Sequence, residues 1–345
     1  MRKTILCLLI LLLLSMLCHA TETEALEKAL PQEIQEHMEG VQEGGGFGEG
    51  LLSILESFSL TQAVKNAMKS VGIMLAAVCL CAVAGQDNHA ATMAGVLTIA
   101  AAGMLELNTM VRAGQEALET LQSFGDLLLP AMATATAASG SIQASTALYA
   151  GTVLCSDVLL HLMGRALFPM IYAYVALRAA QAVWGQEVLG RLSDLIKWAF
   201  SLGIKTVLFL YIAYLAITGL ISGAADATTV KAAKLALSGV VPVVGSMISD
   251  ASETVLVGAA ALKNSVGVFG MLAVCAICLE PFLQVGVQYL LLKLAGAAGG
   301  ALGQKPLLSL MDGLCDAMGF ALALLGTGAL FLLIACICYL KVVPG

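Results

Sequence analysis

Long runs of apolar residues recur along this chain, and shorter stretches between them carry most of the charged side chains. A helix needs about 20 mostly apolar residues to cross the hydrocarbon core of a bilayer, and most of the runs approach that length. The pattern predicts an all-α fold: a polytopic helical membrane protein with seven or eight transmembrane helices after a signal peptide. The expected spans are Val71–Gly85, Ala91–Leu107, Leu127–Tyr149, Ala150–Ala180, Trp198–Ile221, Val255–Leu279, Phe282–Leu302 and Leu314–Leu340, with Leu235–Met247 as a short or re-entrant piece.

The composition agrees with this pattern and excludes several classes of protein. Of the 345 residues, 59% are hydrophobic and 12% are charged, and the mean hydropathy is +0.93. Soluble domains have about 45–50% apolar and about 25% charged residues, so a water-soluble enzyme is excluded. The alternating pattern of membrane barrel strands is absent. The net charge of −6 comes mainly from residues 21–49, where eight glutamates accompany one lysine, so no basic surface is available for nucleic acid.

The amino terminus has the order of features found in secretory signals. Arg2 and Lys3 precede an apolar run from Ile5 to Leu17, and Ala20 supplies a small residue for cleavage. We expect a cleaved signal peptide, with an uncleaved first helix as the alternative. The predicted organisation is a signal peptide (1–20), an acidic, glycine-rich extracytoplasmic tether or docking arm (21–50), an amphipathic interfacial helix (51–70) and a multi-span domain (71–345).

Two stretches between the predicted spans carry many of the remaining charges. Asn108–Asp126 and the stretch from Arg178 to Lys197 are polar enough that we expect solvated loops. Trp198, Tyr211 and Tyr214 are then available as interfacial anchors of the span that follows.

The predicted span Leu127–Tyr149 is unusual because it contains the hydroxyl-rich run PAMATATAASGSIQAST. In a membrane, hydroxyl groups are best placed against other helices or beside water, where they can form hydrogen bonds. Two interpretations follow: small residues for close helix packing, and the lining of an aqueous passage.

The cysteines and histidines match no catalytic or metal-binding pattern in the sequence. Cys275 and Cys278 have a CxxC spacing, but no second pair or histidine lies at zinc-finger distance and their neighbours are apolar. The sequence also has no nucleotide-binding, hydrolase or metalloprotease motif. We therefore expect packing cysteines, no metal or other cofactor, and no enzymatic activity.

Asp157, His161 and Arg165 form a candidate polar face inside an apolar run. They are four residues apart, so one helical face carries all three. A charge that faces lipid costs about 2.5–3.5 kcal/mol on insertion scales, so this face should contact protein or water. An internally satisfied ion pair and a polar pathway are the two interpretations.

The segment Leu235–Leu279 contains the strongest break in the apolar pattern. Pro242 lacks a backbone donor and disfavours helix in the residue before it. A half-helix that dips into the membrane is the simplest interpretation, with Asp250 and Glu253 near the start of the next helix. A kinked helix pair with an exposed turn is the alternative.

This segment, VVPVVGSMISDASETVLVGAAALKNSVGVFG, together with Glu280-Pro281 and the upstream LLLPAMATATAASGSIQAS, resembles the stage III sporulation protein AE family of endospore-forming Firmicutes. The resemblance extends over nearly the whole chain, and its most specific part is PVVGSM-SDA-E. The motif positions that we expect to shape the membrane core are Pro242, Gly245, Ser246, Asp250, Glu253, Lys263, Asn264 and Pro281.

The resemblance implies a membrane component of a secretion-like channel complex that joins mother cell and forespore and supports late forespore development. It implies a multi-pass protein of the cell membrane, specifically the mother-cell-derived outer forespore membrane. The implied partners are the lipid bilayer, other membrane proteins of the same complex in a hetero-oligomer, and a cytoplasmic ATPase. It supplies no catalytic residues.

An autonomous secondary transporter or permease is the competing function. It is motivated by the break at Pro242 and by the acidic residues Asp157, Asp250 and Glu253. Such transporters usually have paired halves with corresponding broken helices, whereas this sequence has one clear break. A membrane-embedded protease has no Ser/His or paired-Asp motif to support it.

Overall fold

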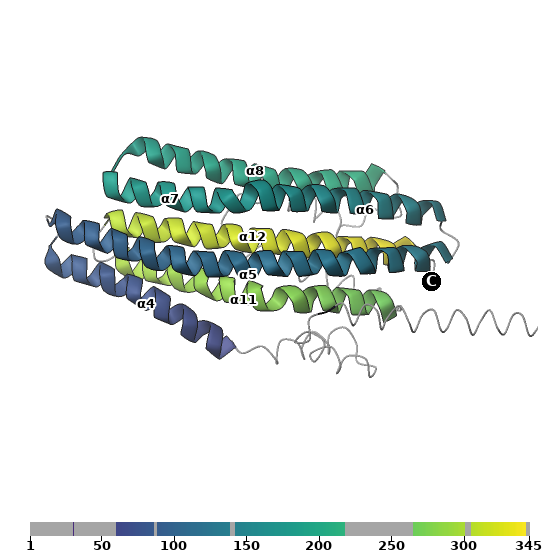
Figure 1. Cartoon of the computed structure of the whole chain (residues 1–345), viewed down its shortest axis with the longest axis horizontal. Helices are drawn as coiled ribbons and strands as arrows, with labels where there is room; N and C mark the ends of the chain where they lie inside the picture. Colours follow the sequence, from purple (N-terminus) through teal and green to yellow (C-terminus); the bar gives the residue numbers. More distant parts are fainter. Residues whose placement is uncertain are drawn as a thin grey trace, which may run out of the picture.

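The computed structural model describes residues 30, 60–85, 88–138, 142–217, 265–300 and 305–342, and in these residues it contains helices and no strand (Figure 1). This confirms the predicted all-α class. The helices are α4 (Leu60–Ala84), α5 (His89–Ala138), α6 (Ile142–Leu162), the π-helix η1 (Met163–Leu167), α7 (Phe168–Trp184), α8 (Glu187–Ile217), α11 (Ser265–Gly300) and α12 (Lys305–Val342).

Within the described residues, six stretches are long and apolar enough to cross a membrane, so the chain is a polytopic membrane protein. These stretches are Ala63–Ala84, His89–Thr134, Thr146–Trp184, Glu187–Ala216, Phe269–Gly300 and Lys305–Tyr339. The structure has fewer and longer helices here than the predicted spans, because several predicted boundaries lie inside continuous helices. The predicted signal peptide, the acidic segment, residues 51–59 and Leu235–Met247 lie outside the described residues.

The predicted loop Asn108–Asp126 is wrong, because this stretch is the middle of α5. Its apolar residues recur at helical spacing, and Leu107, Val111 and Leu118 are buried against the rest of the bundle. The charged residues occupy the opposite face of the same helix. An amphipathic helix therefore replaces the predicted loop.

The predicted loop between Arg178 and Lys197 is also wrong. Helix α7 ends at Gly185, which adopts a left-handed conformation (φ 66°) and donates its N–H to Gln181 O at 2.8 Å. Helix α8 begins at Glu187. The connection is therefore a tight turn, and the charged side chains lie on two long helices.

Pro169 and Pro281 lie within or beside helices, whereas Pro242, where the sequence predicted a break, lies outside the described residues. Pro281 is buried inside α11, which runs continuously through the predicted boundary between Leu279 and Phe282. Pro169 follows η1, in which the N–H of Phe168 bonds to Met163 O, five residues earlier. This wider turn lets the chain absorb a residue that cannot donate a backbone hydrogen bond.

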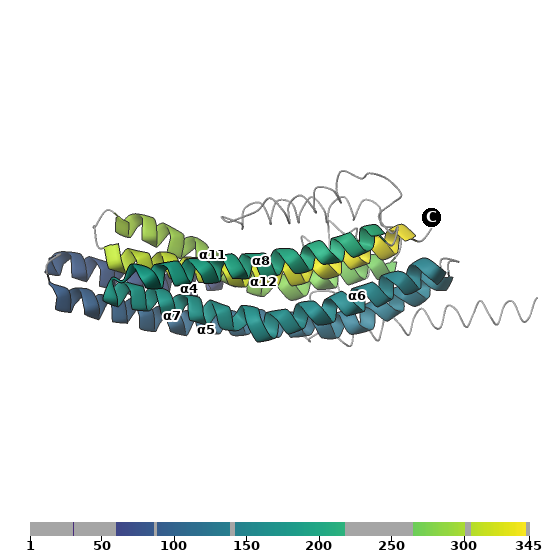
Figure 2. The same ribbon diagram turned by 90° about the horizontal axis from the view of Figure 1, so that it is seen from above.

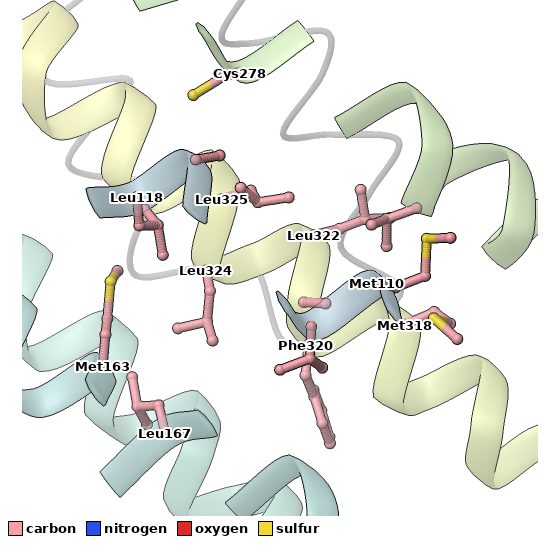
Figure 3. Close-up of a cluster of buried hydrophobic side chains, with 14 of the residues drawn as sticks. Met110, Leu118, Met163, Leu167, Cys278, Met318, Phe320, Leu322, Leu324 and Leu325 are labelled. Atoms are coloured by element: carbon pink, nitrogen blue, oxygen red, sulfur yellow. The ribbon is translucent and has the colours of Figure 1, made fainter. Parts of the chain in front are cut away.

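Helix α12 lies at the centre of the bundle and contacts α5, α7 and α11 (Figure 1). Viewed from above, α5 and α7 lie in one layer, and α11 and α12 lie in another (Figure 2). Apolar side chains fill the space between the layers; Figure 3 shows Met110, Leu118, Met163, Leu167, Cys278, Met318, Phe320, Leu322, Leu324 and Leu325 in this core.

Glycines allow α5 to approach α12 closely. Leu314 lies directly against Gly103, where a Cβ atom would overlap its side chain, and Leu332 lies against Gly125. Small residues give the same close packing in membrane helices generally. The residue numbers increase together from the first contact to the second, so α5 and α12 run parallel.

The aromatic residues of α8 only partly follow the prediction. Trp198 is exposed, as an interfacial anchor should be. Tyr211 is fully buried and packs on Phe331 with ring centroids 4.3 Å apart, so its predicted role as an anchor is wrong. Tyr214 lies against Gly151 and donates its hydroxyl hydrogen to Ala147 O at 2.7 Å, which joins α8 to α6.

Candidate functional site

A cluster of ionisable side chains joins α7, α8 and α12 inside the bundle. At its centre, one carboxylate oxygen of Asp316 accepts hydrogen bonds from the Tyr174 hydroxyl at 2.7 Å and the Lys197 ammonium at 2.8 Å. The Lys197 and Asp316 side chains are 30% and 26% exposed. The consecutive helices α7 and α8 thus meet the distant helix α12 at a single acid. We call Tyr174, Arg178, Asp194, Lys197 and Asp316 the Asp316 cluster.

Arg178 extends the cluster toward the surface. Its guanidinium donates to the Tyr174 hydroxyl at 3.1 Å and to Asp194 at 3.0 Å, and it lies over the Tyr174 ring at 5.3 Å. A third contact reaches the Gln181 amide oxygen at 3.3 Å. The arginine therefore fixes α7 to α8 while also positioning the tyrosine that binds Asp316.

The electrostatics of the cluster follow from its burial. An ion pair taken out of water gains little net stability, but removal of one partner leaves an uncompensated charge. Asp316 has two donors on the same oxygen, so its loss would affect α7 and α8 together. The cluster is therefore suited to fixing the mutual register of three helices.

A pocket of about 420 Å³ opens beside the cluster, and its wall carries charges of both signs. It is lined by Arg178, Lys305, Leu308, Ser309, Asp312, Gly313 and Asp316. None of these lining residues is a cysteine or histidine. In the part of the chain that the structure describes, no group of three or more His, Cys, Asp or Glu side chains is arranged to hold a metal ion.

Further polar contacts join neighbouring helices at about the same depth. The Tyr172 hydroxyl donates to Asn108 at 3.2 Å, which links α7 to α5. The Gln288 amide donates to the Ser70 hydroxyl at 3.0 Å, which links α11 to α4. Each contact satisfies polar groups that would otherwise lie unpaired between apolar helices.

The structure places the predicted polar face on α6 and η1. Asp157 and His161 lie 3.2 Å apart, with side chains 70% and 60% exposed. Arg165, on η1, is also exposed. None of the three belongs to the Asp316 cluster.

Most of the predicted motif positions lie outside the described residues: Pro242, Gly245, Ser246, Asp250, Glu253, Lys263 and Asn264. Pro281 is described and is buried in α11. Their predicted role in shaping the membrane core stays a prediction.

Sequence reasoning missed the Asp316 cluster, although one signal was present. Asp316 is an acid two residues inside the predicted apolar span Leu314–Leu340, and ionisable residues in such spans usually mark internal contacts. Its partner Lys197 and the neighbouring Arg178 were assigned to a solvated loop, so no pairing with Asp316 was considered.

Comparison with known proteins gives two matches. The profile of the family described as Stage III sporulation protein AE matches residues 84–341. A curated relative, stage III sporulation protein AE of Bacillus subtilis (strain 168), is 24% identical over 197 residues, which cover 57% of this chain and 49% of that protein. The chain therefore spans about half the length of the curated relative it matches. No solved structure is significantly similar.

Proposed function

The chain belongs to the stage III sporulation protein AE family, and from this we propose that it is a membrane component of the channel complex that joins mother cell and forespore. The observation that carries the proposal is the family match over residues 84–341, which includes most of the helices able to cross a membrane. The family implies a role in sporulation, and the apolar helices imply a multi-pass membrane protein.

In this proposal, the protein lies in the mother-cell-derived outer forespore membrane and acts by assembly. Its partners are other membrane proteins of the same complex and a cytoplasmic ATPase. The family is named for a stage of sporulation and not for a reaction, which supports a role without catalysis. The Asp316 cluster supports the same view, because its contacts join helices to one another.

Deletion of the gene in an endospore-forming host that encodes it tests the proposal. We expect engulfment to finish normally, while late forespore transcription and heat-resistant spores are lost. Expression of the intact chain from a second locus should restore both. Normal late forespore transcription in the deletion strain would overturn the proposed function.

A secondary transporter is the second candidate, and the ionisable residues of the Asp316 cluster within apolar helices favour it. Such residues often belong to ion pathways in transporters. The purified chain, reconstituted alone in liposomes with a proton or sodium gradient, would then drive solute uptake. Uptake that is abolished by Asp316→Asn would support this candidate over the channel component.

A further inference from the structure

Two outward faces of the bundle differ in polarity at the same depth. On one of them, helices α5, α6 and η1 expose ionisable side chains along the middle of the bundle, with the apolar Leu127, Val153, Leu154 and Val158 among them. We call this surface the charged face; its residues are Arg112, Glu116, Glu119, Asp126, Asp157, His161 and Arg165.

The helices of the charged face run antiparallel in one layer. The contact between Tyr172 and Asn108 aligns α7 with α5, and the two segments meet again where α5 ends and α6 begins. His161 lies 11 residues before Tyr172, and Glu119 lies 11 residues after Asn108. Because the helices are antiparallel, the two residues are at about the same level. Figure 2 shows α5 and the α6–α7 segment in one layer, and Figure 1 shows α12 in the space between them.

Helix α8 is apolar on its outward face at this same level. Leu314 lies against Gly103, which places Asp316 beside the part of α5 around Glu106, and Lys197 binds Asp316. Beyond Lys197, α8 therefore runs at the depth of the charged face. Its exposed large side chains there are Trp198, Leu202, Phe209 and Leu210.

The polarity is reversed toward the other end of the bundle. There α5 exposes Met93, Leu97, Met104 and Leu105, whereas α8 exposes charged side chains among apolar ones. They are Glu187, Arg191 and Asp194, with Val188, Leu192 and Leu195. A flat bilayer at either depth would therefore bring lipid against charged side chains on one of the two faces, which is costly. One face must be shielded from lipid.

The hydrophobic segments show which depth belongs to the bilayer. Residues 317–339 of α12 contain no charged residue, and the membrane-spanning stretch that includes them has the highest hydropathy of the six. Trp198–Ile217 of α8 contains one charged residue, Lys205. The bilayer therefore surrounds the level at which α8 is apolar, and this is the level of the charged face.

We propose that the charged face borders a water-filled passage within the bilayer. This inference deepens the proposed channel function and rests on it. Water is the occupant because the cores of protein interfaces are depleted of charge, whereas this face carries seven ionisable side chains. Among the described residues, the ion pair between Asp157 and His161 is the one found on this face, so the other charges depend on hydration.

Cysteine accessibility in the full-length chain tests the proposal. Single cysteines replace Glu116, Glu119 or Asp126 on the charged face, and matched cysteines replace Leu202, Phe209 or Leu210 on α8. The exposed native Cys79 is changed to alanine to lower the background. Membranes from sporulating cells are treated with a membrane-impermeant, cationic methanethiosulfonate, and with a lipid-soluble maleimide for comparison.

We expect the impermeant reagent to modify the charged-face positions at least about tenfold faster than the α8 positions. Thiols react as hydrated thiolates, and the α8 positions face lipid. Similar rates at both sets would place this level in bulk water outside the bilayer and overturn the proposal. No reaction at the charged-face positions would show that protein covers them, and would also overturn it.

Two controls keep the result decisive. Spore formation by each variant shows that the chain is folded and assembled, and exposed Gln122 and Ser123 provide further positions on the charged face if a glutamate variant is lost. The deletion phenotype is independent of labelling. If sporulation requires the gene but the charged-face cysteines do not react, the proposed function stands and the proposed water-filled passage is rejected.

Discussion

The Asp316 cluster and the charged face use the same kinds of side chain in opposite surroundings. In the cluster, Lys197 and Asp316 are mostly buried, and each bonds a group on another helix. On the charged face, Asp157 and His161 are mostly exposed and pair within one helix. The role of a charged side chain therefore depends on its burial. A buried charge fixes helices to one another, whereas an exposed charge determines whether the surface can face lipid or water.

Replacement of Asp316 by alanine should have the largest effect on stability. Lys197 and the Tyr174 hydroxyl would lose their shared acceptor, and a broken buried pair typically costs about 3–5 kcal/mol. We expect a loss near the upper end of what a single substitution does, measured as the free energy of unfolding by SDS titration in mixed micelles.

Glu119→Ala on the charged face is the matched control for that substitution. Because Glu119 is exposed, its removal should change the free energy of unfolding by less than about 0.5 kcal/mol. The double replacement Asp316→Leu with Lys197→Met should recover much of the loss, since no charge is left unpaired. Equal losses for Asp316→Ala and Glu119→Ala would remove the distinction between the two regions.

Glycine substitutions should have the next largest effect, and they should destabilise the packed interior more than the charged face. Gly103→Ala would place a Cβ atom inside the Leu314 side chain, and such overpacking costs about 1–3 kcal/mol. Gly164, on η1 beside Arg165, has no neighbouring atom within 4 Å of the position that a Cβ atom would take, so Gly164→Ala should be neutral or slightly stabilising. The thermal midpoint in detergent measures both, and a larger shift for Gly164→Ala would contradict the packing of α5 on α12.

Most of the fold class was predictable from the sequence, but the helix lengths were not. Hydropathy averages over all faces of a helix. The exposed charges of α5 therefore lowered the average around the buried Leu107, Val111 and Leu118, and a loop was predicted there. The expected break at Pro281 failed for a related reason. A proline inside a packed membrane helix is tolerated where neighbouring groups satisfy the backbone, and the sequence alone does not show those neighbours.

The candidate site was less predictable, because its contacts are tertiary. Asp316 and Tyr174 are 142 residues apart, and the spacing rules that found Asp157 and His161 apply only within one helix. Asp316, the one acid in the predicted span Leu314–Leu340, indicated an internal contact. Which cation it would meet depended on the packing of α7 and α8, and no local pattern records that packing.

Tyr174→Phe should have a smaller effect than Asp316→Ala. It removes the hydroxyl that donates to Asp316 and accepts from Arg178, while the ring and its contact with Phe320 remain. A hydrogen bond to a charged group contributes about 1.5–3 kcal/mol, and Lys197 still binds the carboxylate, so we expect the lower end of that range. Tyr149→Phe, on the more exposed part of α6, is the control and should change little.

Asp157→Asn should have the smallest effect, because its partner His161 lies on the same helix and both side chains are well exposed. Exposed pairs at this spacing contribute about 0.3–0.5 kcal/mol, and salt screens them. We expect a change of that size in the free energy of unfolding in detergent, which disappears at high salt. A loss above about 1 kcal/mol that persists in salt would mean that the pair is desolvated in the isolated chain. In that case the charged face would resemble the Asp316 cluster, and hydration could not be the reason for its charges.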